Sequence, residues 1–128
     1  MGGMRRRMAP LATVVLLAAL LAGCAAPTGS GSSALATYPR PEAGMDALLE
    51  GTLIISDRCV WVRSQGMRNV PVFPEGDAEV RDGVLIWRGT EYADGDSISL
   101  GGGYLPDGGT IPAGCGLEPD ALFFVSPY

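Results

Sequence analysis

A short apolar run near the amino terminus sets how much of this chain is left to fold. The run covers residues 11–22 (LATVVLLAALLA) and follows Arg5, Arg6 and Arg7. A helix that crosses a membrane needs about 20 apolar residues, so this run of 12 is too short to remain in a bilayer. A basic segment followed by such a run is typical of a secretory signal peptide. The sequence therefore predicts an exported precursor whose leader is removed.

The apolar run ends in Leu21-Ala22-Gly23-Cys24, which resembles the lipobox of bacterial lipoproteins. In that family the cysteine thiol is alkylated with diacylglycerol, and the chain is cut immediately before the cysteine. The resemblance implies that Gly23 precedes the cut and that Cys24 carries the lipid. It also implies a protein anchored to the cell membrane or the outer membrane, with its domain on the extracytoplasmic side.

The remainder of the chain looks like the small β-rich lipoproteins of high-GC bacteria. This likeness rests on Cys59 in a strand-like run, on 72–74 (Val-Phe-Pro), on Gly95-Asp96, on the glycines at 101–103 and on Cys115. It is a general likeness that implies no activity. Only Cys24 and Gly23 take a role from it.

The segment after Cys24 has the composition of a flexible tether. Residues 25–37 contain no charge, no aromatic side chain and no apolar periodicity, so they cannot bury enough surface to offset the entropy lost on ordering. Pro39 and Pro41 then stiffen the chain. We therefore expect a cleaved signal peptide at 1–23, the lipidated cysteine and tether at 24–38, and a folded domain at 39–128.

The charge of the mature chain excludes several kinds of partner. After Cys24 the chain carries six arginines, no lysine and fourteen acidic residues, a formal charge of −8. Nucleic-acid binding depends on neutralising phosphates, so no nucleic-acid partner is expected. Electrostatic docking on anionic headgroups is also disfavoured. The lipid on Cys24 is thus the predicted link to the membrane.

The chain contains no histidine, which restricts its chemistry. Ser-His-Asp and Cys-His catalytic arrangements and a Cys/His zinc site are impossible within it. Asp94-Gly95-Asp96 resembles the start of a calcium loop, but no Glu closes the loop, and a turn is the preferred interpretation. We therefore predict no cofactor, no metal site and no enzymatic activity.

The residues after Gly51 have the patterns of β-strands. Asp82-Gly83 separates two strand-like runs and favours a tight type I′ hairpin turn. The two prolines of 69–74 place that run at a sheet edge or a barrel seam, and the glycines at 101–103 suggest a bend or bulge. The expected strands cover 52–55, 58–63, 69–74, 78–81, 84–87, 96–100 and 121–126. One or two helical turns are expected within 42–50.

Six or seven short, mostly antiparallel strands with frequent turns predict an all-β fold, either a small barrel or a sandwich. On 58–63 the residues Val60 and Val62 share one face, while Cys59 and Trp61 share the other. Because both faces carry apolar groups, this strand fits a closed or two-layer sheet.

Two cysteines remain once Cys24 is assigned to the lipid. In an extracytoplasmic domain an even pair is most often a disulfide, so we expect Cys59 to bond Cys115. A redox-active pair is the alternative. The two residues are far apart in sequence and no Cys-x-x-Cys motif is present, which disfavours that alternative.

Three aromatic residues are candidate ligand contacts if they prove to be exposed together. These are Trp87, Tyr92 and Tyr104, which could form a platform for a sugar, a peptide or a protein. Burial in the core is the alternative, and it is favoured for a tryptophan.

The sequence thus favours a lipid-anchored β-domain that acts as a binding or interaction module, with an envelope protein as its expected partner. A structural accessory subunit of an envelope complex is the alternative. A carboxylate-dependent hydrolase is ranked last, because no pair of carboxylates is singled out and the domain is small for a cleft.

Overall fold

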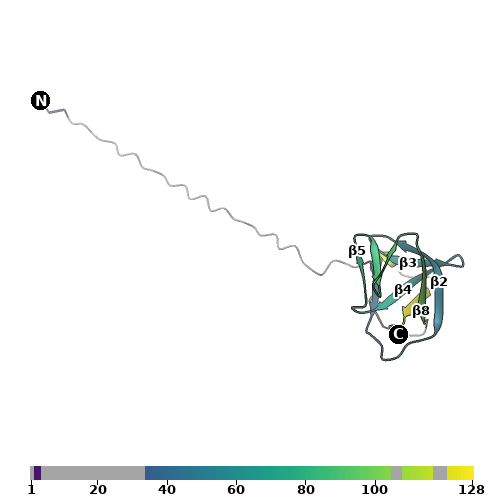
Figure 1. The fold of residues 1–128 in the computed structure, drawn as a ribbon. Coiled ribbons are helices and arrows are strands. Elements are labelled where there is room, and N and C mark those ends of the chain that lie inside the picture. The colour runs from purple at the N-terminus through teal and green to yellow at the C-terminus, as the bar shows by residue number, and fades with distance from the viewer. Residues whose placement is uncertain (1, 4–33, 105–107, 117–120) are drawn as a thin grey trace.

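The computed structural model describes residues 2–3, 34–104, 108–116 and 121–128 (Figure 1). The predicted cleavage and lipidation residues, Gly23 and Cys24, and the segment 25–33 lie outside these ranges. Within them the chain forms nine strands and one short 3₁₀ helix. These are β1 (Ala36–Tyr38), β2 (Ala47–Ile55), β3 (Val60–Ser64), β4 (Met67–Pro74), β5 (Ala78–Arg81), β6 (Val84–Trp87), β7 (Thr90–Ala93), β8 (Ser97–Gly103), η1 (Ala113–Cys115) and β9 (Ala121–Val125).

Five of the strands close into a barrel. Strands β2, β3 and β4 form an antiparallel meander, β8 pairs with the other edge of β2, and β9 pairs with β8. The parallel pairing of β9 with β4 completes the ring. The predicted all-β fold is therefore confirmed, as is the mostly antiparallel arrangement, since among the described strands only the β4–β9 and β1–β4 pairings are parallel.

The strand with two prolines lies at the barrel seam, one of the two places predicted for it. Pro71 and Pro74 are buried in β4, and Pro71 lies opposite Phe123 in the parallel β4–β9 pairing that closes the barrel. Proline cannot donate a main-chain hydrogen bond, so it is tolerated where the ladder of hydrogen bonds is interrupted or changes partner. Strand β4 changes partner along its length, because it pairs with β3 at its start and with β1 at its end.

Strands β5, β6 and β7 form a separate three-stranded sheet beside the barrel (Figure 1). The predicted Asp82-Gly83 hairpin joins β5 to β6, and both residues have the positive φ that a type I′ turn requires (52° and 76°). Two more hairpins use the same kind of turn, at Gln65-Gly66 and at Arg88-Gly89. Strand β7 was not predicted, because its sequence Thr-Glu-Tyr-Ala has little apolar character.

The fold contains two hydrophobic clusters on opposite faces of the barrel wall. Val60 and Val62 are fully buried in an inner core that also holds Leu85 and Trp87 of the small sheet. Cys59 belongs to an outer cluster with Val70, Val72, Cys115 and Phe124, against which Trp61 packs. Both faces of β3 are therefore packed against apolar side chains, as expected from its sequence.

The tether predicted to extend to residue 38 ends earlier than expected. Ala34, Leu35, Ala36 and Tyr38 are all buried, and β1 pairs in parallel with the end of β4. The main-chain oxygen of Ala34 also accepts a hydrogen bond from the Val60 amide (3.1 Å). Residues 34–38 are thus part of the folded domain. Their sequence has no periodicity to detect, and the pairing with β4 makes residues 36–38 a strand.

The helical turns expected within 42–50 are not present. Strand β2 begins at Ala47, and residues 47–52 pair with β8. Leu49 is buried while its neighbour Leu48 is 63% exposed, which is the alternation of a strand. The apolar residues of so short a segment fit the periodicity of a helix and that of a strand equally well. The pairing of residues 47–52 with β8 makes the segment a strand.

The glycines at 101–103 continue β8 rather than forming a separate bulge. Gly102 lies between Ala47 of β2 and Val125 of β9. A Cβ atom there would overlap the main-chain oxygen of Phe124 and come within 2.8 Å of the Phe123 ring. The barrel can close at this point only because residue 102 has no side chain.

We predict that Gly102→Ala lowers the free energy of unfolding by about 1–3 kcal/mol, the usual cost of overpacking. Gly101→Ala is the matched control, because a Cβ atom at that position meets nothing within 4 Å. Urea denaturation of both variants measures the difference. Equal stabilities would contradict the role given to Gly102.

Candidate functional site

The three aromatic residues predicted as ligand contacts do not form an exposed platform. Trp87 is only 6% exposed and packs against Phe73, with ring centroids 5.1 Å apart. Tyr92 is half-buried against the inner core. Tyr104 is 52% exposed, with its ring on the edge of Phe123. The joint exposure on which such a platform depended is therefore not met, and the favoured alternative of burial holds for Trp87.

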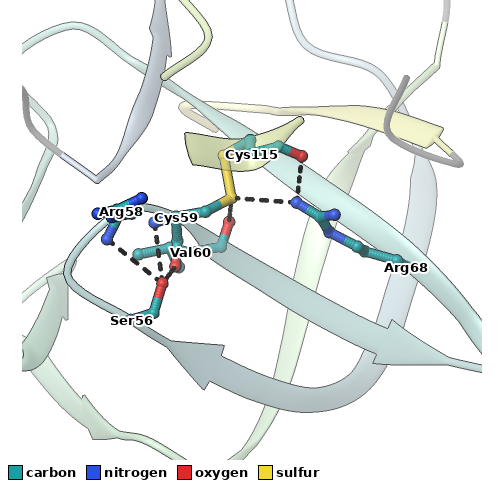
Figure 2. Close-up of a disulfide and its surroundings, with 6 residues drawn as sticks. All are labelled: Ser56, Arg58, Cys59, Val60, Arg68 and Cys115. Atoms are coloured by element: carbon teal, nitrogen blue, oxygen red, sulfur yellow. Dashed lines mark hydrogen bonds between the residues drawn. A yellow bond between two sulfur atoms is a disulfide. The ribbon is translucent and has the colours of Figure 1, made fainter. Parts of the chain in front are cut away.

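The predicted disulfide between Cys59 and Cys115 is present (Figure 2). The two Cα atoms are 4.9 Å apart, and both residues are almost fully buried in the outer cluster. Cys59 lies immediately before β3, where Ser56 donates its hydroxyl to the Cys59 oxygen and accepts the Cys59 amide, both at 3.0 Å. The bond holds η1 against the barrel wall.

Arg68 lies against this disulfide from the neighbouring strand β4 (Figure 2). Its Nη2 atom donates to the main-chain oxygen of Cys115 and lies 3.7 Å from Cys59 Sγ. The guanidinium carbons of Arg68 and Arg63 are 5.6 and 5.5 Å from the centroid of the Trp61 ring. The two arginines thus cover the half-buried Trp61 ring. The buried disulfide is part of the packing of the outer cluster.

Two adjoining cavities form a groove at one end of the small sheet. Their volumes are about 460 and 330 Å³, and both are lined by Gly76, Asp77 and Arg88. The groove lies between the β4–β5 turn and the β6–β7 turn, which the antiparallel β5–β6 pairing brings to the same end of the sheet. We call it the Arg88 groove.

The Arg88 side chain is held by its turn and by the tryptophan before it. The main chain of Arg88 has φ of 50°, as the first residue of the two-residue β6–β7 turn. Its guanidinium carbon lies 5.0 Å from the centroid of the Trp87 ring, and Nη2 donates to the main-chain oxygen of Ser126 at 3.4 Å. Trp87 thus contributes to the groove by supporting a cation.

An ion pair forms the facing wall of the groove. Arg40 Nη1 lies 2.9 Å from Asp77 Oδ1, and the Asp77 side chain is only 20% exposed. Tyr38 lies behind this pair and donates its hydroxyl to the main-chain oxygen of Val125 at 2.7 Å. Burial raises the pKa of Tyr38, and the Asp77 charge raises it further. Tyr38 therefore stays protonated at neutral pH and acts as a hydrogen-bond donor.

Arg88 differs in its charge environment from the other two arginines near the groove. Arg40 is paired with Asp77 and Arg81 with Glu79 (2.7 Å), whereas no described carboxylate oxygen lies within 4.0 Å of Arg88. A guanidinium presents its N–H groups as a planar fork that matches a carboxylate or phosphate. The groove can therefore hold an anionic group. In the sequence, the Arg88 groove is signalled only by the Arg88-Gly89 pair between two strand-like runs.

The two aspartates that resemble a calcium loop form a turn, as preferred from the sequence. Asp94 Oδ1 accepts the Ile55 amide and Asp96 Oδ2 accepts the Ala93 amide, each at 2.8 Å. In the part of the chain that the structure covers, no three His, Cys, Asp or Glu residues are grouped to hold a metal ion. The same residues contain no helix that is long and apolar enough to span a membrane.

Comparison with known proteins gives no relative. No protein-family model, no curated protein and no solved structure matches the chain.

We predict that replacing Cys59 and Cys115 together by Ala lowers the free energy of unfolding by about 4 kcal/mol, the chain-entropy value for a loop of this length. The sequence separation of 56 residues makes the loop long. Urea denaturation of the oxidised protein, the reduced protein and the double variant is the measurement. The reduced protein should match the variant, and a variant as stable as the oxidised protein would contradict the prediction.

Proposed function

We propose that this chain is a lipid-anchored extracytoplasmic binding module that engages its partner through the Arg88 groove. The observation that carries the proposal is the groove itself. It is an open concavity, it is bordered by two tight turns, and it contains a supported guanidinium that no described carboxylate neutralises. Pockets of a few hundred Å³ with a few fixed polar groups are the usual form of a binding site.

Two features support the anchored, exported location. The lipobox-like residues 21–24 follow a basic and then apolar leader. The Cys59–Cys115 disulfide is of a kind that persists in oxidising compartments outside the cytoplasm.

Residues 34–38 run from the disulfide region of the domain to the Arg88 groove. Ala34, where the described domain begins, is hydrogen-bonded to Val60 beside the disulfide, whereas Tyr38 at the end of β1 is bonded to Glu75 next to the groove. Residues 34–38, of which 36–38 form β1, span at most about 14 Å. Only residues 25–33 separate Cys24 from Ala34, and nine residues reach at most about 32 Å. The tether would therefore join the domain at its disulfide end.

For the anchor, we predict that Cys24→Ala abolishes lipidation, because the thiol that would be alkylated is removed. The variant should remain an unprocessed precursor or leave the membrane fraction. Fractionation of cells, followed by mass spectrometry of the amino terminus, makes the measurement. Unchanged processing and unchanged fractionation would refute the lipid anchor.

For the binding function, we predict that a photo-crosslinking amino acid at Glu79 in the full chain captures a partner in cells. Glu79 lines the groove and its side chain is 53% exposed. The matched control is the same amino acid at Gln65, which is exposed in the β3–β4 turn and does not line the groove.

A distinct adduct at 79 that is missing at 65 is the expected result. The same adduct at both positions would indicate a broad interface, as in an accessory subunit. No adduct at position 79 would count against the groove as a binding site.

A further inference from the structure

We infer that the Arg88 groove recognises a single carboxylate on an otherwise uncharged peptide segment of the partner. This inference rests on the proposed function and specifies the chemistry of the same groove. It is carried by the charges that line the groove, by the support of the Arg88 guanidinium and by the charge of the domain as a whole.

Among the charged residues that line the groove, Arg88 is the one that can pair with an anion. Arg40 at the facing wall is engaged by Asp77, and Glu79 at the rim is engaged by Arg81. Arg88 contacts an indole ring and one main-chain oxygen. Neither contact supplies a negative charge, so the groove offers an anion one unneutralised cation.

The support of Arg88 reduces the cost of binding. The Trp87 ring and the Ser126 oxygen already restrict the side chain, and a guanidinium has five N–H groups, of which the Ser126 contact uses one. The remaining donors can make the paired hydrogen bonds of a carboxylate. A side chain that is ordered before binding loses less entropy when the ligand arrives.

The charge balance favours a monocarboxylate over a polymer rich in phosphates. The mature chain has a formal charge of −8, and both Asp77 and Glu79 line the groove. Repeated negative charges would be repelled by the net negative charge of the domain. A single carboxylate can pair with Arg88, and an uncharged remainder can pack on Ala78 and Ile86 in the larger cavity. The size of the cavities suits a short segment of peptide.

The test uses the full lipidated protein, purified from membranes in a neutral detergent and labelled with ¹⁵N. The probe is a random pentapeptide pool without Asp or Glu, acetylated at the amino terminus, so that the free carboxyl terminus is its only carboxylate. The same pool with an amidated carboxyl terminus is the control ligand. The readout is the Nε–Hε resonance of Arg88, assigned with Arg88→Lys.

We predict that the acid pool shifts the Arg88 resonance saturably and that the amidated pool binds at least about tenfold more weakly, as expected for the loss of a charged hydrogen-bonded pair. Arg88→Lys should weaken binding of the acid pool by a similar factor, because lysine keeps the charge but not the fork. Gln65→Asn alters the same turn position of another hairpin and should bind as the wild type does.

Equal binding of the acid and amide pools, or no shift of Arg88 with either, would overturn the inference. Stronger binding of inorganic phosphate than of the acid pool would also overturn it and would favour a phosphate-bearing polymer. If a crosslink at position 79 is still found in cells, the proposed function stands and only the carboxylate chemistry fails.

Discussion

The hydrogen bonding of β4 is the interaction on which the rest of the structure depends. This strand pairs with β3, with β9 and with β1, and its pairing with β9 closes the barrel. Its two faces serve the two hydrophobic clusters, since Phe73 points into the inner core while Val70 and Val72 belong to the outer cluster. A strand that is covered on both faces and paired on both edges leaves its neighbours little freedom to shift in register.

The disulfide and β1 both cover the outer hydrophobic cluster. The cluster lies on the outside of the barrel wall, where the chain has to supply a cover. That cover includes β1 and η1, and the Cys59–Cys115 bond fixes η1 to the beginning of β3. Burial alone contributes modestly in a domain of this size, so a covalent link across a long loop is a large share of its stability.

The Arg88 groove is a consequence of the same architecture. The end of β1 lies beside the beginning of the β4–β5 turn, and the antiparallel β5–β6–β7 sheet returns the β6–β7 turn to that place. Arg40, Asp77 and Arg88 come from three separate segments and meet only because these turns coincide. The start of the folded domain at Ala34 and the groove beside Tyr38 therefore lie at opposite ends of residues 34–38.

The sequence by itself determined the all-β class, the Asp82-Gly83 hairpin, the edge or seam position of the two-proline strand and the disulfide pairing. Each of these follows from local turn chemistry, from alternation along a strand or from a count of two cysteines. Only the tertiary structure decided that 34–38 and 47–50 are strands, that Trp87 is buried, and that Arg88 faces an ion pair. The two strands depend on partners more than 25 residues away, β4 for β1 and β8 for β2, and Trp87 is buried against Phe73 of another sheet. Short apolar segments without a periodicity of their own take the conformation that such distant pairings impose.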